Sequence, residues 1–163
     1  MRVKELIQHD ESDCGAACLA IILSFYGRET SIRKIREAAG TDKVGTSGYG
    51  IQEGAKKFGL DCKGLFCSEK EKVTEIPLPA ILHFNKDGSE HYVVIYKVKK
   101  DFVYISDPAK GLRKIKKDEL FEYWSGIFFF FYPSSKFEKK SDKKGNLIRF
   151  FSLLKPYKKL VIQ

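Results

Sequence analysis

Residues 8–27 read QHDESDCGAACLAIILSFYG, and they place Cys14 where a polar stretch turns into an apolar run. Ser12 or Asp13 can cap a helix at this point, and Gly27 can end it. The stretch therefore predicts an apolar helix that begins close to Cys14. A helix N-terminus lowers the pKa of a cysteine, because unpaired backbone N–H groups and the helix dipole favour the thiolate. Cys14 is either a small core residue or a nucleophile, and its partners decide which.

The composition bounds the fold and the compartment. A chain of 163 residues that is 43% hydrophobic and 13% aromatic can bury one substantial core, so one main domain is expected. The charged N-terminus lacks the apolar run of a signal peptide. Four cysteines without regular spacing fit a reducing compartment better than a disulfide framework. We therefore expect a cytosolic domain in which Cys14 is free to react.

The net charge of +9 is unevenly distributed along the chain. Residues 1–132 hold 21 basic and 19 acidic side chains, whereas residues 133–163 hold 9 basic and 2 acidic ones. The excess thus lies in a lysine-rich tail, which is typical of a solvated linker rather than of a binding surface. No nucleic-acid motif accompanies it, so the sequence predicts no nucleic-acid partner.

The pattern of apolar residues divides the chain into a helical half and a sheet half. Further helices are predicted at 31–39, capped by Thr30, and at 50–58, which ends before Gly59. Strands are predicted at 79–85, 90–98, 101–107, 112–115 and 126–133, with a helix at 116–124 before the last of them. The glycine-rich loop GTSGYG lacks the spacing and the lysine of a phosphate-binding loop. The fold class predicted is α+β, with an antiparallel sheet in the second half.

A nucleophilic cysteine needs a base, and the base needs a residue that orients it. His9 lies in the polar lead-in and His83 lies inside a predicted strand, whereas His91 opens a strand at the rim of the sheet. Asp107 ends the next strand, so two antiparallel neighbours would bring it beside His91. Asp107 precedes a proline and could equally be a plain turn aspartate.

Gln8 supplies the remaining part of a possible active site. Attack of a thiolate on a carbonyl group forms an oxyanion, which needs hydrogen-bond donors. Gln8 lies six residues before Cys14, so its side-chain amide and the Cys14 backbone N–H could donate to the same oxyanion. Gln, Cys, His and Asp in this order, on a helix start and a sheet, describe a papain-like constellation. The competing interpretation is a zinc site built from Cys14, Cys18, Cys62 and Cys67 together with His9, but the cysteine spacings do not match paired zinc knuckles.

Three motifs together resemble a known family. QHDESDCGAACLAI is similar to the opening of the N-terminal cysteine peptidase domain of bacteriocin-processing ABC transporters, the double-glycine leader peptidases. HYVVIYKV and ISDPAKG resemble the histidine and aspartate motifs of that family, and GTSGYGIQEGAKKFGL and LPAILHFN match its layout. The resemblance runs from about Gln8 to Tyr132.

The resemblance implies a role for each of four residues. Cys14 would be the nucleophile, His91 the general base and later acid, Asp107 the residue that orients the imidazole, and Gln8 the oxyanion donor. The fold would be that of a papain-like cysteine protease. The substrate would be the leader of a bacteriocin or similar secreted precursor peptide, cut after a Gly-Gly or Gly-Ala pair. No cofactor or metal is expected for the peptidase, and ATP would serve only a transporter portion.

The resemblance also implies a domain plan for a longer protein. Residues 1–132 would form the peptidase domain, residues 133–146 a basic linker, and residues 147–163 the start of a membrane-proximal segment. We expect the domain, soluble in isolation, to lie on the cytosolic side of a bacterial membrane. There it would be fused to transmembrane and nucleotide-binding domains, in a full-length protein expected to be dimeric.

Two other functions remain open at this point. A docking module could hold the leader without cutting it, although such a role places no demand on Gln8, Cys14, His91 and Asp107. A papain-like hydrolase or acyltransferase with an unrelated substrate would also use these four residues. A Gly-Gly leader substrate separates the three possibilities.

Overall fold

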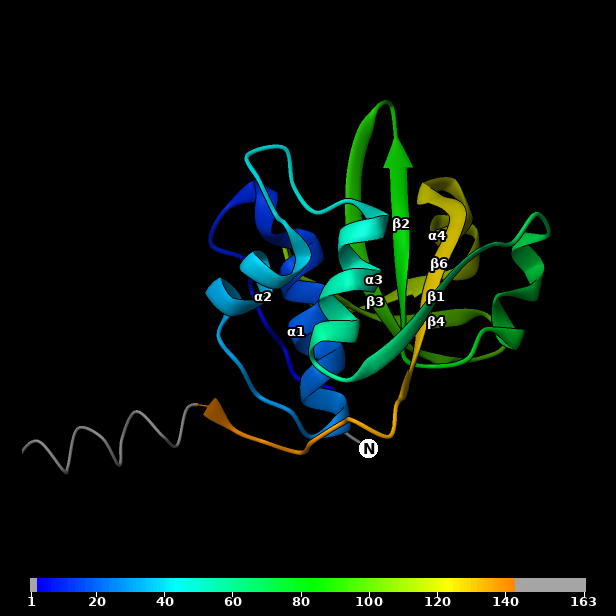
Figure 1. Ribbon diagram of the computed structural model, residues 1–163. Coiled ribbons are helices and arrows are strands. Elements are labelled where there is room, and N and C mark those ends of the chain that lie inside the picture. The colour runs from blue at the N-terminus through cyan, green and yellow to red at the C-terminus, as the bar shows by residue number, and fades with distance from the viewer. Residues whose placement is uncertain (1–2, 143–163) are drawn as a thin grey trace, which may run out of the picture.

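A computed structural model describes residues 3–142 of the chain, as a six-stranded sheet with three helices packed on one face and a shorter helix on the other (Figure 1). The helices are α1 Cys14–Tyr26, α2 Ile32–Ala39, α3 Gly48–Lys57 and α4 Lys117–Tyr123, with 3-10 turns η1 Glu11–Asp13 and η2 Lys70–Glu75. The strands are β1 Leu60–Phe66, β2 Ala80–Lys86, β3 Ser89–Val98, β4 Phe102–Asp107, β5 Gly111–Lys116 and β6 Trp124–Pro133. The predicted α+β class is confirmed.

Helix α1 begins at Cys14, as its sequence predicts, and lies between α2, α3 and the sheet (Figure 1). Its first ten residues are all buried, which suits a helix that is apolar on every side. Gly27 ends it in the left-handed conformation. The predicted cap at Ser12 or Asp13 is wrong: no side chain caps α1, because a 3-10 turn precedes it and Asp10 caps that turn by accepting from the Ser12 N–H.

Helices α2 and α3 pack on one another and on α1. The predicted cap of α2 shifts by one residue, since Ser31 accepts from the Lys34 N–H while Thr30 donates to Asp142. Gly50 lies at the contact between α2 and α3, where an added Cβ would clash with the Ala39 carbonyl oxygen. The close approach of these two helices therefore depends on a glycine at position 50.

We expect Gly50→Ala to lower the free energy of unfolding by about 1–3 kcal/mol, because the helices must separate to admit the methyl group. Urea unfolding followed by circular dichroism measures the change. Lys56→Ala is the matched control on the exposed side of α3, and we expect it to stay within about 0.5 kcal/mol of wild type. Equal stability of the two variants would contradict the contact.

The sheet is antiparallel throughout and has the strand order β1-β6-β2-β3-β4-β5. The helices α1 and α3 cover one face, where Ile81, Val94 and Phe129 join their core. Helix α4 and the η2 turn cover the other face, around Trp124. The strand predicted at 126–133 is confirmed as part of β6, and its aromatic run is buried at Phe128, Phe129 and Phe131.

The pairing of β3 with β4 positions two of the predicted site residues. The two strands form an antiparallel hairpin in which Val94 pairs with Ser106. His91 therefore lies near the start of β3, at the end of the sheet where β4 finishes with Asp107. The juxtaposition expected from the sequence is confirmed.

After β6 the chain continues along the helical side of the domain. Phe137 packs against Tyr26, Asp142 accepts from Lys34 and Thr30, and Glu29 pairs with Ser141. Residues 134–142 of the predicted linker thus contact the domain, while residues 143–163, with the rest of that linker and the predicted membrane-proximal segment, lie outside the described residues. Among residues 3–142, no helix has the length and apolar character needed to cross a bilayer.

Candidate active site

Cys14 is the first residue of α1, and its side chain lies almost entirely under neighbouring groups, with 8% of the residue exposed. Burial raises the pKa of its thiol, but hydrogen bonds with the His91 side chain and the Tyr92 backbone outweigh burial. The net result is a pKa below the ordinary value for a cysteine. Cys14 therefore has the low pKa of a reactive cysteine, not the raised value of a core thiol.

His91 connects Cys14 to Asp107. Its Nε2 lies 2.8 Å from Asp107 Oδ1, and its ring also hydrogen-bonds the Cys14 thiol. Because Nε2 faces the carboxylate, Nδ1 is the ring nitrogen left to face sulfur. The order of contacts is thus thiol, imidazole, carboxylate, which is the order that a cysteine nucleophile with a positioned base requires.

The charges of the three groups reinforce one another. Burial lowers the pKa of His91, but the hydrogen bonds to Asp107 and Cys14 overcome this and raise it to about 9. Burial raises the pKa of Asp107, yet hydrogen bonds from His91 and from the Ala109 N–H bring it below its ordinary value. At neutral pH the site therefore holds an imidazolium beside a carboxylate, and the imidazolium favours ionisation of the Cys14 thiol.

Arg113 extends this chain of charges beyond Asp107. Its Nη1 lies 3.6 Å from Asp107 Oδ2, the oxygen that His91 does not use, and its Nη2 lies 3.2 Å from Glu119 Oε1. Asp107 Oδ1 meanwhile accepts from the Ala109 N–H at 2.9 Å. Both oxygens of the Asp107 carboxylate thus have partners, and these contacts fix the orientation of the carboxylate toward the His91 ring.

A second ion pair fixes the start of α1. Asp13, directly before Cys14 and 6% exposed, pairs with the Arg36 guanidinium from α2. The same guanidinium lies 3.5 Å from the Ser12 hydroxyl. Gly15, on the other side of Cys14, packs so closely on Thr46 that an added Cβ would lie 2.7 Å from the Thr46 Cβ. The backbone at Cys14 is therefore held from both sides.

Gln8 reaches the site through the segment that precedes η1. Its backbone N–H donates to the Pro108 carbonyl at 2.8 Å, which ties this segment to the turn after β4. Its side-chain oxygen is buried and finds no hydrogen-bond partner among residues 3–142. Gln8 thus lies beside His91 and Asp107, as the sequence predicts, while its role as oxyanion donor stays a prediction.

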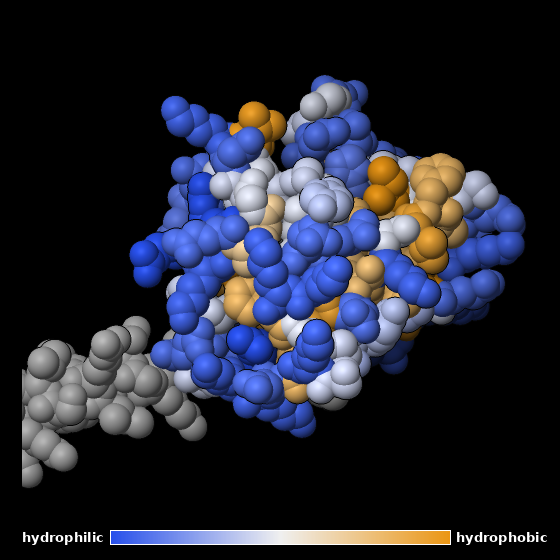
Figure 2. Space-filling model, viewed as in Figure 1, coloured by the Kyte–Doolittle hydropathy of each residue, from blue (hydrophilic) through white to orange (hydrophobic). Residues whose placement is uncertain are grey.

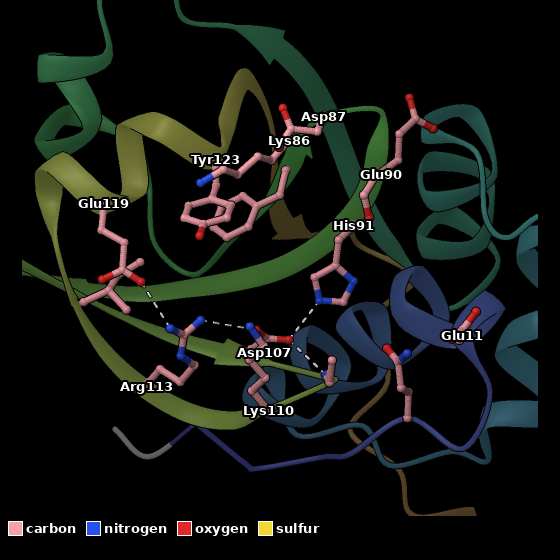
Figure 3. Close-up of a pocket in the computed structure, with 15 residues that line it drawn as sticks. Glu11, Lys86, Asp87, Glu90, His91, Asp107, Lys110, Arg113, Glu119 and Tyr123 are labelled. Carbon is pink, nitrogen blue, oxygen red and sulfur yellow. Dashed lines mark hydrogen bonds and ion pairs between the residues drawn. The ribbon is translucent and has the colours of Figure 1, made fainter.

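Two hollows, here called the histidine hollow and the cysteine hollow, adjoin at the site, and Figure 3 shows the histidine hollow. The histidine hollow has a volume of about 670 Å³, and Gln8, His91, Asp107, Arg113 and Tyr123 are among its lining residues. The cysteine hollow has a volume of about 470 Å³, and Cys14, Thr46, Gly48, Tyr92 and Phe129 are among its lining residues. Glu90 lines both, so the hollows adjoin, with the thiol on one side and the imidazole on the other.

His83, Cys18 and Cys62 take structural positions. His83 Nδ1 lies 2.9 Å from the Ser125 hydroxyl, and burial lowers the pKa of its ring, so its interpretation as a satisfied strand histidine is confirmed. Cys18 is fully buried, and burial raises the pKa of its thiol. Cys62 lies within β1, and burial raises the pKa of its thiol to about 12.

The pKa directions predict selective alkylation. Iodoacetamide should modify Cys14 ahead of Cys18 and Cys62, because only the thiolate reacts and only Cys14 of these three has a lowered pKa. The rate at Cys14 should already be high at pH values below the ordinary thiol pKa. Mass spectrometry of tryptic peptides after short exposure at a series of pH values measures this. Faster modification of Cys62 at neutral pH would contradict the assignment.

Sequence reasoning did not find Arg113, Arg36 or the two hollows. Arg113 comes from the strand beside β4 and Arg36 from a different helix, so neither has a fixed spacing from the residue that it holds. From the sequence, Asp13 is predicted only as a helix cap. A buried acidic residue directly before Cys14 could have signalled a cationic partner.

Most of the chain matches a known protein family. Residues 2–136 match the model of the Peptidase C39 family. The match thus extends from the start of the chain to just beyond β6, and it includes all four predicted site residues.

Curated relatives cover nearly the whole chain. It is 40% identical to the lactococcin-G-processing and transport ATP-binding protein of Lactococcus lactis, over 98% of this chain and 23% of that protein. It is 31% identical to the pediocin PA-1 transport/processing ATP-binding protein of Pediococcus acidilactici, over 94% of this chain and 22% of that protein. The chain spans less than a quarter of the length of these relatives.

Solved structures of similar domains complete the comparison. A double glycine motif protease from an AMS/PCAT transporter, solved in complex with the leader peptide, superposes with a TM-score of 0.76 at 32% identity, over 82% of this chain and 93% of that one. The peptidase domain of Streptococcus ComA, a bifunctional ABC transporter, gives a TM-score of 0.75 at 31% identity, over 82% of this chain and all of that one. The chain therefore belongs to the Peptidase C39 family.

Proposed function

We propose that this chain is a cysteine endopeptidase domain that removes the leader from a bacteriocin or similar secreted precursor peptide, cutting after a Gly-Gly or Gly-Ala pair. The observation that carries the proposal is the contact chain from Cys14 through His91 to Asp107, in a member of the Peptidase C39 family. A non-catalytic docking role gives no reason for a thiol with a lowered pKa beside a protonated imidazole.

Catalysis proceeds in two steps in this proposal. The Cys14 thiolate attacks the carbonyl carbon of the scissile peptide bond, and the tetrahedral oxyanion accepts hydrogen bonds from the Gln8 side-chain amide and the Cys14 backbone N–H. The C–N bond breaks as His91 gives its proton to the leaving amine, which leaves a thioester on Cys14. A water molecule, deprotonated by His91, then attacks the thioester and frees the leader and the thiolate.

Asp107 keeps His91 usable in both steps. Its carboxylate fixes the ring orientation and stabilises the imidazolium that forms whenever His91 holds two protons. The Arg113 guanidinium beside the second oxygen keeps Asp107 ionised and restrains its rotation. Arg113 is therefore a positioning residue in this mechanism.

The lining of the cysteine hollow is compatible with a glycine pair before the cut. Gly45, Thr46 and Gly48 form part of its wall. Gly48 lies so close to Phe129 that even a Cβ on this residue would come within 2.9 Å of the ring. Gly45 and Gly48 have no side chains, so this wall lets the backbone of a substrate approach Cys14 closely, and the preference for a glycine pair follows the double glycine motif protease that the chain resembles.

Exposed apolar side chains continue outward from the cysteine hollow. Ile127, which lines it, is 37% exposed and pairs across the strands with Phe66, which is 67% exposed beside the half-exposed Leu65. Figure 2 shows apolar side chains gathered on the side of the molecule where β1 and β6 pair. We assign this surface to apolar side chains of the leader.

The test of the proposed function is cleavage of a synthetic leader peptide with a few residues after its Gly-Gly pair. We expect mass spectrometry to find a single cut after the second glycine, without ATP, and no cut when either glycine is replaced by valine. Binding without cleavage would favour the docking module instead. Efficient cutting after bulky residues would favour a hydrolase with an unrelated substrate.

Gln8→Ala should lower kcat by about 10²-fold or more with little change in KM, because the lost hydrogen bond forms chiefly in the transition state. Steady-state kinetics on the Gly-Gly peptide separate the two constants. The neighbouring side chain of Ile7 is half exposed and lines neither hollow, so Ile7→Ala is the control. A rise in KM alone would mean that Gln8 binds substrate rather than the oxyanion.

In this proposal the peptidase domain is the N-terminal domain of an ABC transporter. Its curated relatives are named as transport and processing proteins of more than four times the matched length. We propose that transmembrane and ATP-binding domains follow this domain, that the full protein is a dimer, and that the domain works on the cytosolic side of the bacterial membrane. The peptidase itself uses no cofactor in the mechanism above.

A further inference from the structure

We propose that the histidine hollow binds the first residues of the cargo, those that follow the cleaved bond, and that it favours basic side chains there. This inference rests on the proposed function and extends it to the part of the substrate that leaves first.

The chemistry assigns the two ends of the substrate to different groups. The leader is the acyl part, so it becomes bonded to Cys14 Sγ when the peptide bond breaks. The cargo carries the new amine, and that nitrogen takes its proton from His91. The leader must therefore lie on the side of the thiol and the cargo on the side of the imidazole.

The structure separates those two sides. Cys14 lines the cysteine hollow and is absent from the lining of the histidine hollow, whereas His91, Gln8 and Asp107 line only the histidine hollow. With a volume of about 670 Å³, the histidine hollow can take several amino acid residues. A peptide that runs from one hollow to the other lies across the hydrogen-bonded pair of Cys14 and His91, which is where the scissile bond has to lie.

Charge in the histidine hollow is unbalanced toward the acidic side. Two of its three Lys and Arg side chains have carboxylate partners: Arg113 pairs with Asp107 and Glu119, and Lys86 pairs with Glu122. Lys110 has no ion-pair partner within residues 3–142.

Three carboxylates of the same hollow have no Lys or Arg partner in the described part of the chain. These are Glu11, Asp87 and Glu90. Glu90 lies 3.9 Å from His83, a ring whose pKa burial lowers, so it is not compensated at neutral pH. Three unpaired carboxylates against one unpaired ammonium favour a basic ligand.

The unpaired carboxylates lie where the cargo would leave the site. Figure 3 shows Glu90 and Glu11 on the His91 side of the hollow, Asp87 next to Lys86, and Arg113 and Glu119 on the side opposite His91. Glu11 comes from the turn before α1 and Glu90 from the residue before His91, so they approach the cargo from different elements. A lysine or arginine close behind the cut can thus meet a carboxylate from either element.

The experiment compares two substrates with one leader, one with lysines and one with glutamates in the first positions after Gly-Gly. A third substrate carries an aminocoumarin amide directly after Gly-Gly and has no cargo residues. For the wild-type domain we expect kcat/KM to be about fivefold higher or more for the lysine substrate, the range that partly exposed ion pairs give. The ratio should shrink in about 1 M salt, where the Debye length is about 3 Å.

Charge reversal tests the two carboxylates directly. The double variant Glu11→Lys with Glu90→Lys should invert the preference, so that the glutamate substrate becomes the faster one. Its rate on the aminocoumarin substrate corrects for any change in the reactivity of Cys14. Glu75→Lys, on an exposed turn that lines neither hollow, should keep the wild-type preference.

Each outcome decides the inference. Equal rates of the wild-type domain on both charged substrates, or a preference that survives the double reversal, would overturn the cargo site while leaving the peptidase function intact. No cleavage of any of the three substrates would overturn the proposed function and this inference with it. Inversion of the preference in the double variant but not in Glu75→Lys is the result that supports the site.

Discussion

Replacing Cys14 with alanine is expected to lower the cleavage rate of a Gly-Gly leader peptide by about 10⁴-fold or more, because no other group can form the thioester. The change removes one sulfur atom at the first residue of α1, where Asp13 and Gly15 still hold the backbone. The fold should therefore stay intact, and circular dichroism and urea unfolding check this. Product formation is measured by chromatography and mass spectrometry.

Two further cysteine variants sharpen this result. Cys14→Ser should be almost as inactive, since a serine hydroxyl stays protonated where the thiol ionises. Cys62→Ala is the control, because Cys62 lies in β1, lines neither hollow and has a raised pKa. Retained cleavage in Cys14→Ala, or loss of cleavage in Cys62→Ala alone, would refute the assignment of the nucleophile.

His91→Ala is expected to reduce cleavage by a comparable factor, about 10⁴-fold, since the variant lacks both the base and the acid of the mechanism. The variant should also raise the pKa of the Cys14 thiol, which loss of a purely structural residue would not do. The hydrogen bond with His91 lowers the pKa of Cys14 against burial, which raises it. Without the imidazole, the pH at which iodoacetamide modifies Cys14 should move upward.

The pH profile of the wild-type domain provides the complementary observation. Activity needs the Cys14 thiolate and the His91 imidazolium together, so kcat/KM should fall at high pH as His91 loses its proton, near its pKa of about 9. His9→Ala is the control for histidine replacement, since His9 is exposed and lines neither hollow. If the pH dependence of Cys14 alkylation were unchanged in His91→Ala, His91 would not be the group that lowers the pKa of the Cys14 thiol.

Much of the fold could be predicted because its signals are local. The mostly apolar run from Ala16 to Tyr26 follows a polar stretch with capping residues and ends at Gly27, which predicts a buried helix. The turn around Gly88 separates two β-branched runs, which is a hairpin signal. His91 and Asp107 could be brought together by sequence reasoning because only one antiparallel hairpin separates them.

The parts that sequence did not predict depend on contacts between distant segments. Strand β6 lies between β1 and β2, an order that no local pattern specifies. The cap of α2 shifted from Thr30 to Ser31 because Asp142, more than a hundred residues later, takes the threonine hydroxyl. Arg113 reaches Asp107 from a neighbouring strand. The division into two hollows likewise arises only when the helices and the sheet meet.

The most direct test of the account is covalent capture of the nucleophile by a substrate-like probe. A leader peptide that ends in Gly-Gly and carries a chloromethyl ketone in place of the scissile bond should alkylate one residue per chain. Peptide mapping by mass spectrometry should place the modification on Cys14, and His91→Ala should slow it strongly. Modification of Cys18, Cys62 or Cys67 in its place, in a preparation that cleaves the leader substrate, would contradict the central claim that Cys14 attacks the bond after the glycine pair.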